Sequence, residues 1–378
     1  MLNSTLRRVA VSGELSMTDI ASTMAAFSFT GGQAGEEARV EVVSLRQIAE
    51  RGGALDLDDR GFPVRPLVVV DLDSADWRAA QAAAAVLEGG RNPVLVGVAT
   101  SALPAAAAPL LERLTCTLAP AGPGLYCAGD AADLDSIAGT VGAAPYAAVT
   151  LAGLLDVSTT CSVADGLLLE SLAYSMLLAG PEFTAWRTGT PRGDIVGGDE
   201  PVLLERSGDT LTITLNRPDR HNAFGHAVRD GLLRGLDIAR HDPAVREVVV
   251  SGAGRSFCSG GDLDEFGTTP NVPAAHLVRL HHSAGHAVHR LRDRVRFVVH
   301  GACIGAGVEI PSFAGSVVAR DDAYFQLPEL RMGLIPGAGG TVSITRRIGR
   351  WRTAYLALTN RRVDVPTALR WGLVDGRA

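Results

Sequence analysis

The sequence contains no lysine, so all 35 of its basic residues are arginines. Set against 41 acidic residues, they leave a formal net charge of −6, which argues against nucleic acid as the main partner. Cysteine is also scarce, and the five cysteines, at positions 116, 127, 161, 258 and 303, show no Cys-x-x-Cys spacing. An odd, scattered set of this kind indicates reduced thiols and predicts a cytoplasmic location.

Long hydrophobic runs are absent as well. Residues 1–8 lack the apolar core of a signal peptide, and the longest apolar stretch, from Ala143 to Leu155, is too short to cross a bilayer and is followed by Asp156. We therefore expect a soluble protein with no membrane partner. The chain of 378 residues, 47% of them hydrophobic, is long enough for two domains with cores of their own.

The first half is predicted to hold an α/β domain over residues 63–187, after a segment, residues 1–62, with only weak patterns. Buried-type strands alternate with helices, which favours largely parallel pairing; the strands are expected at 67–72, 93–98, 114–118 and 147–151, and the helices at 75–87, 105–113 and 133–141. Ser162 then begins a helix that runs to Ala179, with Asp165 placed to complete a capping box. Because this helix is apolar on most sides, we expect it to be buried.

A Gly-, Pro- and charge-rich stretch, residues 188–200, reads as a linker to a second α/β unit over residues 201–378. In this unit Leu211, Ile213 and Leu215 alternate with threonines, as in a half-buried strand. Helices are expected at 225–241 and 274–292, and a strand at 247–251. Strands and helices follow one another similarly in both halves, so the first half is either a degenerate copy of the second or shares only generic α/β spacing with it.

The stretch from Gly301 to Gly340 carries the most chemistry. A glycine-rich turn opens a helix there, and the free N–H groups of a helix start favour negative charge. Glu309 lies in the first turn of that helix, and Glu329 follows in the sequence Leu-Pro-Glu. Amides that stabilise an anion, beside two carboxylates, suit proton transfer next to a carbonyl group. The alternative is a charge at a helix start and a solvated loop residue.

Several motifs together are similar to those of the crotonase superfamily, the enoyl-CoA hydratase/isomerase family. They are Leu-Asn-Arg-Pro at 215–218, His-Asn-Ala at 221–223, Gly-Gly-Asp-Leu at 260–263, Gly-Ala-Gly-Val-Glu at 305–309, Leu-Pro-Glu at 327–329 and Ile-Pro-Gly-Ala-Gly-Gly at 335–340. The resemblance covers residues 201–378. It implies a crotonase-like ββα spiral core, an acyl-CoA thioester as substrate, no separate cofactor, no metal, and a homo-oligomer, a trimer or hexamer.

The resemblance also implies roles for single residues. The backbone N–H groups of Gly261 and Ala306 match those that polarise the thioester carbonyl in this family. Glu309 and Glu329 match its two catalytic glutamates, one of which activates water while the other supplies a proton to the α-carbon. Gly337 matches a backbone position that helps to hold the water.

Binding of the coenzyme A nucleotide is expected near the matched turns, and the candidates are Arg217, Arg220, Arg255, Gly260, Asp262 and Leu263. The three arginines could equally be solvated surface residues. His282, His286 and His289 lie at helical spacing that could bind a metal, but we expect a solvated face.

Two departures from the family pattern bear on the site. Pro311 follows Glu309 closely enough to bend the helix and re-aim that carboxylate. The sequence ends at Ala378, where family members usually continue with helices that cover the site. We expect the helix from Ser162 to Ala179 to pack on the core in their place.

The sequence thus predicts an enzyme that hydrates a 2-enoyl-CoA. Isomerisation, or another reaction of secondary metabolism through the same enolate, is the competing enzymatic reading. A non-catalytic acyl-CoA-binding or assembly subunit is the competing class of protein.

Overall fold

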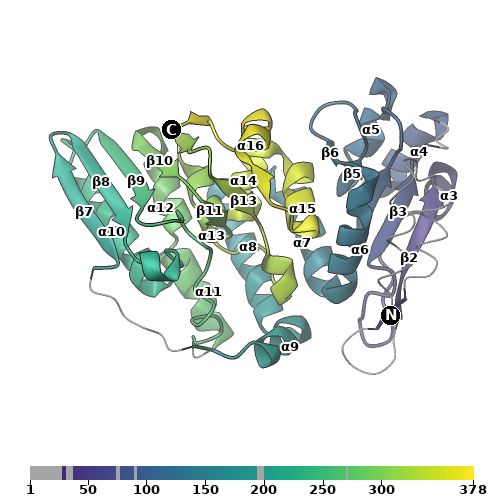
Figure 1. Ribbon diagram of the computed structural model, residues 1–378. Coiled ribbons are helices and arrows are strands. Elements are labelled where there is room, and N and C mark those ends of the chain that lie inside the picture. The colour runs from purple at the N-terminus through teal and green to yellow at the C-terminus, as the bar shows by residue number, and fades with distance from the viewer. Residues whose placement is uncertain (1–27, 31–36, 74–76, 89–91, 194–199, 270) are drawn as a thin grey trace. The chain divides into compact units, whose positions relative to one another are not determined.

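The computed structural model of the chain describes residues 28–30, 37–73, 77–88, 92–193, 200–269 and 271–378 (Figure 1). It divides into two compact units, Met1–Pro145 and Tyr146–Ala378. This division differs from the predicted boundary at 188–200. The helices α8 (Val163–Leu178) and α9 (Pro181–Gly189) fall in the C-terminal unit, and so does α7 (Pro145–Ser158) apart from its first residue.

The N-terminal unit contains one six-stranded sheet whose strands lie in sequence order. The first two strands are antiparallel and all later pairs are parallel. The strands are β1 (Ser28–Thr30), β2 (Glu37–Ser44), β3 (Leu67–Asp71), β4 (Val94–Val98), β5 (Cys116–Leu118) and β6 (Cys127–Gly129). The helices are α3 (Leu45–Arg51), α4 (Trp77–Leu87), α5 (Ala108–Leu111) and α6 (Leu134–Ala143). All five residues of β4 are buried, as expected for a parallel sheet covered on both faces. The largely parallel α/β prediction is confirmed here.

The strand predicted at 147–151 is wrong, because these residues lie inside α7. Pro145 occupies the first position of that helix, where a missing N–H costs nothing. Periodicity alone does not distinguish a short apolar strand from part of a buried helix. The prediction also missed β6, which is only three residues long.

The C-terminal unit is built on a second six-stranded sheet, with the order β15-β12-β10-β9-β8-β7. Its strands are β7 (Val202–Ser207), β8 (Thr210–Leu215), β9 (Glu247–Gly252), β10 (Val295–Val299), β12 (Ser316–Ala319) and β15 (Gly376–Arg377). Again an antiparallel hairpin begins a series of parallel strands in sequence order. A three-stranded sheet joins β11 (Ala302–Ile304), β13 (Tyr324–Gln326) and β14 (Val363–Asp364). This three-stranded sheet has no counterpart among the described residues of the N-terminal unit.

Helices of the C-terminal unit follow the predictions in part. The helix α10 (His226–His241) buries Val228, Leu232, Leu236 and Ala239, as its spacing predicted. The single helix predicted at 274–292 is instead two helices, α11 (Val272–His281) and α12 (Ala284–Arg290). Ser283 separates them, because its side chain accepts a hydrogen bond from the His286 N–H and caps α12. Three more helices close the unit: α14 (Gly340–Ile348), α15 (Arg350–Thr359) and α16 (Val365–Trp371).

The apolar helix α8 packs on the core of the C-terminal unit, as predicted, but it is not buried all round, because Leu168, Leu172 and Met176 are 41%, 49% and 57% exposed. Ser162 caps it by accepting a hydrogen bond from the Asp165 N–H. At Gly166 an added Cβ would lie 2.9 Å from Val342 of α14, so the two helices approach closely there. Among the described residues no single helix is long and apolar enough to cross a membrane, although two bent helix pairs meet the criteria jointly by length and composition.

Candidate active site

Two turns that follow strands bring Gly261 and Ala306 to the same cavity, which has a volume of about 250 Å³. One turn follows β9 and the other joins β11 to the short helix α13 (Ala306–Glu309). The turns run side by side. The backbones of Cys258 and Cys303 pair as an isolated parallel β-bridge, and the Ile304 N–H donates to the Cys258 carbonyl at 3.0 Å. Within the part of the chain that the structure describes, neither the Gly261 nor the Ala306 N–H donates a hydrogen bond. Both amides are therefore available to a ligand oxygen.

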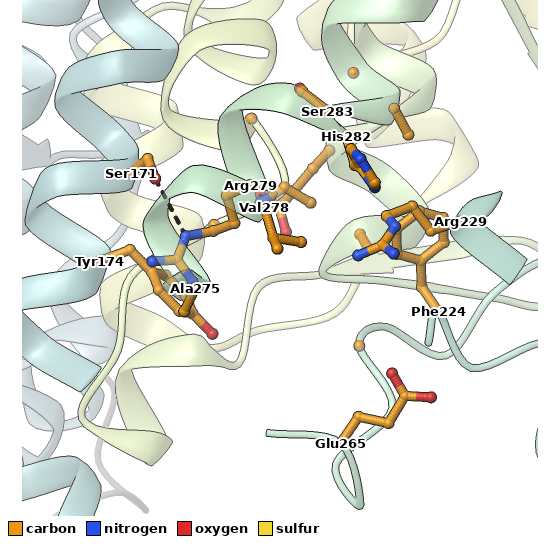
Figure 2. A pocket seen from close by; sticks show the side chains of 18 of the residues that line it. Ser171, Tyr174, Phe224, Arg229, Glu265, Ala275, Val278, Arg279, His282 and Ser283 are labelled. Carbon is orange, nitrogen blue, oxygen red and sulfur yellow. Dashed lines mark hydrogen bonds between the residues drawn. The ribbon is translucent and has the colours of Figure 1, made fainter. Parts of the chain in front are cut away.

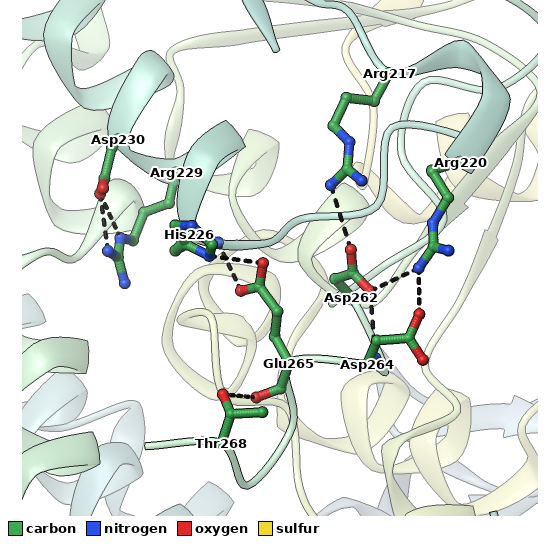
Figure 3. Close-up of polar contacts among 9 residues, drawn as sticks. All are labelled: Arg217, Arg220, His226, Arg229, Asp230, Asp262, Asp264, Glu265 and Thr268. Atoms are coloured by element: carbon green, nitrogen blue, oxygen red, sulfur yellow. Dashed lines mark hydrogen bonds and ion pairs between the residues drawn. The ribbon is translucent and has the colours of Figure 1, made fainter. Parts of the chain in front are cut away.

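Buried ion pairs fix the turn that carries Gly261 (Figure 3). Asp262 is 3% exposed and lies 3.3 Å from Nη1 of Arg217 and 3.1 Å from Nη2 of Arg220. Arg220 also pairs with Asp264, whose N–H donates to Asp262. Removing one partner of such a buried pair leaves an uncompensated charge and costs roughly 3–5 kcal/mol. The network therefore holds the Gly261 amide in a fixed orientation.

Asn222 supports the same turn from the neighbouring loop. Its side chain is fully buried, accepts a hydrogen bond from the Arg217 N–H at 2.7 Å, and donates to the carbonyls of Ala253 and Ser256 at 2.9 Å. Its φ of 54° lies in the left-handed region, which asparagine tolerates better than most residues. The His-Asn-Ala motif thus has a structural reason in this chain.

Glu309 projects from α13 onto the turn that precedes α14. Its Oε2 accepts hydrogen bonds from the Ala338 and Gly340 N–H groups, both at 2.8 Å. Burial raises the pKa of Glu309 to about 7, although the two N–H donors oppose this rise by stabilising the anion. A Cβ added at Gly340 would lie 2.7 Å from Cγ of Glu309, so the carboxylate rests directly on a residue without a side chain.

Glu329 begins a 3-10 helix, Glu329–Met332, and lies against Gly305. A Cβ added at Gly305 would lie 2.5 Å from Oε1 of Glu329, and the φ of 51° at Gly305 also favours glycine. Oε2 of Glu329 is buried and makes no hydrogen bond with any described residue. Burial, and then the charge of Glu309, raise the pKa of Glu329 well above its usual value. The two carboxyl groups titrate as an interacting pair.

Pro311 shortens the helix that carries Glu309. The helix α13 ends at Glu309, and a 3-10 helix, Pro311–Phe313, follows at once. The proline has no N–H to continue the helical hydrogen bonds. Despite this early end, Glu309 lines the same cavity as Gly261, Ala306 and Glu329.

One wall of the cavity comes from α8 (Figure 2). Tyr174 lies against Gly337, and the guanidinium of Arg279 from α11 stacks over its ring at 4.5 Å. Ser171 accepts from Nε of Arg279 at 3.3 Å, and Ser175 also accepts from this guanidinium. Burial raises the pKa of the Tyr174 hydroxyl. Glu170 completes this wall, and both of its oxygens bond to the turn before α14.

The residues of this wall were missed by the sequence analysis. A signal existed, because Glu170, Ser171, Tyr174 and Ser175 recur at helical spacing in an otherwise apolar helix. The pattern could not show which groups these four polar side chains would contact.

The predicted ligands of coenzyme A are placed differently from one another. Arg217 is 6% exposed, and its guanidinium is held inside by Asp262. Arg255 is exposed and makes no hydrogen bond or ion pair with a described residue, and Leu263 is 45% exposed. Gly260, with a φ of 99°, shapes the turn before Gly261. Among the three predicted arginines Arg255 is therefore the exposed one, and the role of all these candidates in binding stays a prediction.

The candidate histidines do not share one helix. His282 follows the last residue of α11 and lines the cavity, whereas His286 and His289 lie in α12. The ring of His289 lies 6.2 Å from that of Phe313. Over the described ranges, no three His, Cys, Asp or Glu side chains come together as a metal site.

Comparison with known proteins identifies the family. A family model described as enoyl-CoA hydratase/isomerase matches residues 205–376. A 1,2-epoxyphenylacetyl-CoA isomerase of Escherichia coli is 33% identical over 179 residues, which cover 46% of this chain and 68% of that protein. A probable enoyl-CoA hydratase of Mycobacterium bovis is 30% identical over 176 residues, with coverage of 47% and 68%.

Among solved structures, an enoyl-CoA hydratase from Thermoplasma volcanium is 28% identical, with a TM-score of 0.45 and coverage of 48% of this chain and 72% of that chain. Both relatives are matched over about two thirds of their length, and the family model spans the cavity-lining residues other than those of α8. The chain therefore belongs to the enoyl-CoA hydratase/isomerase family of the crotonase superfamily, a family of enzymes that process acyl-CoA thioesters.

Proposed function

We propose that this enzyme adds water to the double bond of a 2-enoyl-CoA thioester. The observation that carries the proposal is the convergence of two kinds of group on one cavity: the unbonded amides of Gly261 and Ala306, and the carboxyl groups of Glu309 and Glu329. The amides suit a thioester oxygen that becomes enolate-like in the transition state. The paired carboxyls suit the transfer of two protons.

The environments of the two glutamates support different roles. Glu309 accepts two backbone hydrogen bonds, which favour its ionised form. Glu329 has an oxygen without a partner among the described residues, and burial, followed by the charge of Glu309, disfavours its ionisation. In the proposal, Glu309 is the general base and Glu329 is the general acid.

The reaction then proceeds without any group beyond the chain, the thioester and water. Glu309 takes a proton from water while the water oxygen forms a bond to C3. The electron pair of the C2–C3 double bond moves towards the thioester oxygen held by Gly261 and Ala306. Glu329 gives its proton to C2, and the thioester carbonyl is restored. The coenzyme A part of the substrate is expected on the side of Arg255, and no further cofactor is required.

Isomerisation of an enoyl-CoA is the second candidate. One relative is named as an isomerase, and the same carboxyls could move a proton between carbons of one enolate. The two reactions differ in whether water is incorporated.

The direct test is the loss of enoyl-thioester absorbance when the full chain is mixed with crotonyl-CoA. Glu309→Gln and Glu329→Gln should each lower turnover by roughly 10²–10⁴-fold while acyl-CoA binding persists. Rearrangement of a 3-enoyl-CoA, without water uptake, would favour isomerisation instead. Tight acyl-CoA binding with neither reaction would favour a binding subunit, and a glutamine variant with near-full activity would overturn the role given to that residue.

A further inference from the structure

Glu170 is a third buried glutamate at the candidate active site, and it lies outside the segment that matches the family. The family model begins at residue 205, whereas Glu170 lies on α8. Its side chain is 2% exposed and borders the same cavity as Glu309 and Glu329. A carboxyl group buried to this degree requires a specific set of partners.

Those partners are all in the turn between Gly337 and Thr341. Oε1 of Glu170 accepts from the Gly339 N–H at 2.8 Å, and Oε2 accepts from the Thr341 N–H at 3.0 Å and from the Thr341 hydroxyl at 2.6 Å. Glu309 accepts from the two intervening N–H groups, those of Ala338 and Gly340. Successive amides of this turn therefore point alternately to Glu309 and to Glu170.

This alternation couples the position of Glu309 to that of Glu170. The turn is held between the two carboxyl groups, and it leads into α14, whose N-terminal end favours negative charge. Because both oxygens of Glu170 are occupied by the turn, neither is left to activate water or to protonate substrate. Its effect on the reaction must pass through the turn and through charge.

The charge of Glu170 also acts on its neighbours. The groups that face it are Glu309 from α13, Glu329 from the 3-10 helix, Tyr174 from α8 and Arg279 from α11. Burial, and then the charge of Glu309, raise the pKa of Glu170 to about 8. Glu309 therefore ionises first, and the charge of Glu170, once formed, adds to burial and to the charge of Glu309 in raising the pKa of Glu329.

We propose that Glu170 is a positioning residue for the catalytic base: it fixes the turn of residues 337–341, whose Ala338 and Gly340 amides hold Glu309. The inference rests on the proposed function for its kinetic part only. It assigns a role in the active site to a helix that the family model does not include.

The kinetic test compares Glu170→Gln with Asp165→Asn in the full chain. Glutamine keeps the shape of the side chain, but its amide would face a backbone N–H and it removes the charge. Asp165 is an exposed carboxylate on the same helix, so its variant removes the same charge away from the cavity. We expect Glu170→Gln to lower kcat by roughly 10–100-fold, since small misplacements of catalytic groups have effects of this order, with KM nearly unchanged.

The pH profile separates positioning from a merely structural role. Glu170 still carries its proton when Glu309 ionises, so its charge does not set the acid limb. A turn displaced in Glu170→Gln should hold the Glu309 anion less well, so the acid limb of kcat should move to higher pH in Glu170→Gln and stay in place in Asp165→Asn. A Glu170→Gln variant with the kcat and acid limb of the parent chain would overturn the proposal. So would a variant whose activity falls only in proportion to its folded fraction, with the limb unmoved.

A second measurement does not depend on catalysis. Hydrogen exchange of peptides covering residues 337–345 should accelerate in Glu170→Gln and more in Glu170→Ala, because glutamine can accept from only one of the Gly339 and Thr341 amides and alanine from neither. If crotonyl-CoA is not hydrated but exchange accelerates, the proposed function fails and the role of Glu170 in holding the turn stands. Unchanged exchange in both variants would refute that role whatever the reaction.

Discussion

The contact between Gly340 and Glu309 allows a test of the proposal that Glu309 is the general base, by the substitution Gly340→Ala. The added Cβ would lie 2.7 Å from Cγ and 2.9 Å from Oε2 of Glu309. Real Cβ atoms do not approach other atoms so closely, and ordinary van der Waals contact begins at 3.4 Å. The carboxyl group must therefore move away from the very amide that donates to it. The backbone of Gly340 itself accepts alanine, since its φ is not positive.

The size of the effect follows from these distances. Restoring ordinary contact requires a shift of roughly 0.5–1 Å, and a misplacement of about 1 Å can reduce rate by roughly 10²-fold. The shift also weakens a hydrogen bond to a charged group, worth about 1.5–3 kcal/mol. Because that bond favours the ionised form, its loss should raise the pKa of Glu309 further above 7. We expect kcat to fall by roughly 10–100-fold and the acid limb to move to higher pH.

The assay is hydration of crotonyl-CoA as a function of pH, with circular dichroism to confirm folding. The matched control is Gly153→Ala in α7, where an added Cβ meets no atom within 4 Å. That exposed helical position should gain about 0.5–1 kcal/mol of stability with no change in kcat. Full activity and an unmoved acid limb in Gly340→Ala, beside a well-behaved control, would refute the assignment of Glu309 as the base held by this turn.

Three further predictions follow from the same geometry. The acid limb of the pH profile of kcat should lie near pH 7 in the parent enzyme rather than near 4.5, because burial raises the pKa of Glu309 to about 7. Activity should fall again at higher pH, when Glu329 loses its proton. An acid limb at the ordinary glutamate pKa would contradict the burial argument. Ala306→Pro should lower kcat by roughly 10²–10³-fold through loss of one amide donor, whereas Ala306→Gly should be mild; an active proline variant of intact fold would place the oxyanion elsewhere. A fragment of residues 146–378 should stay soluble and active, whereas a fragment of residues 190–378 should aggregate, because removal of α8 uncovers the buried Val342. Size-exclusion chromatography distinguishes the two fragments. A soluble, active shorter fragment would contradict the role of α8.

The sequence by itself indicated the family and the residues of the candidate active site. Motifs at fixed spacing predicted the two amide-bearing turns and both glutamates, and the structure brings Gly261, Ala306, Glu309, Glu329 and Gly337 to one cavity. Such motifs are readable because each depends on local geometry: glycine at a positive φ, a turn after a strand, a carboxylate at a helix start. Alternation in β8 and amphipathic spacing in α10 were readable for the same reason.

Local patterns failed where burial or a single cap decided the outcome. The apolar run at 147–151 is a helix, and one serine divides the helix predicted at 274–292. In both cases the residues are compatible with either structure, so packing against the rest of the unit makes the choice.

Only the tertiary structure decided how α8 takes part in the site. The sequence predicted that this helix is buried on the core, but not that Glu170 shares a turn with Glu309, at a separation of 169 residues from Gly339. Nor did it show that Arg217 is held inside by Asp262. Contacts of this kind join segments far apart in the chain, and no local pattern specifies which amides a buried carboxylate will meet, because that choice depends on how the helices pack.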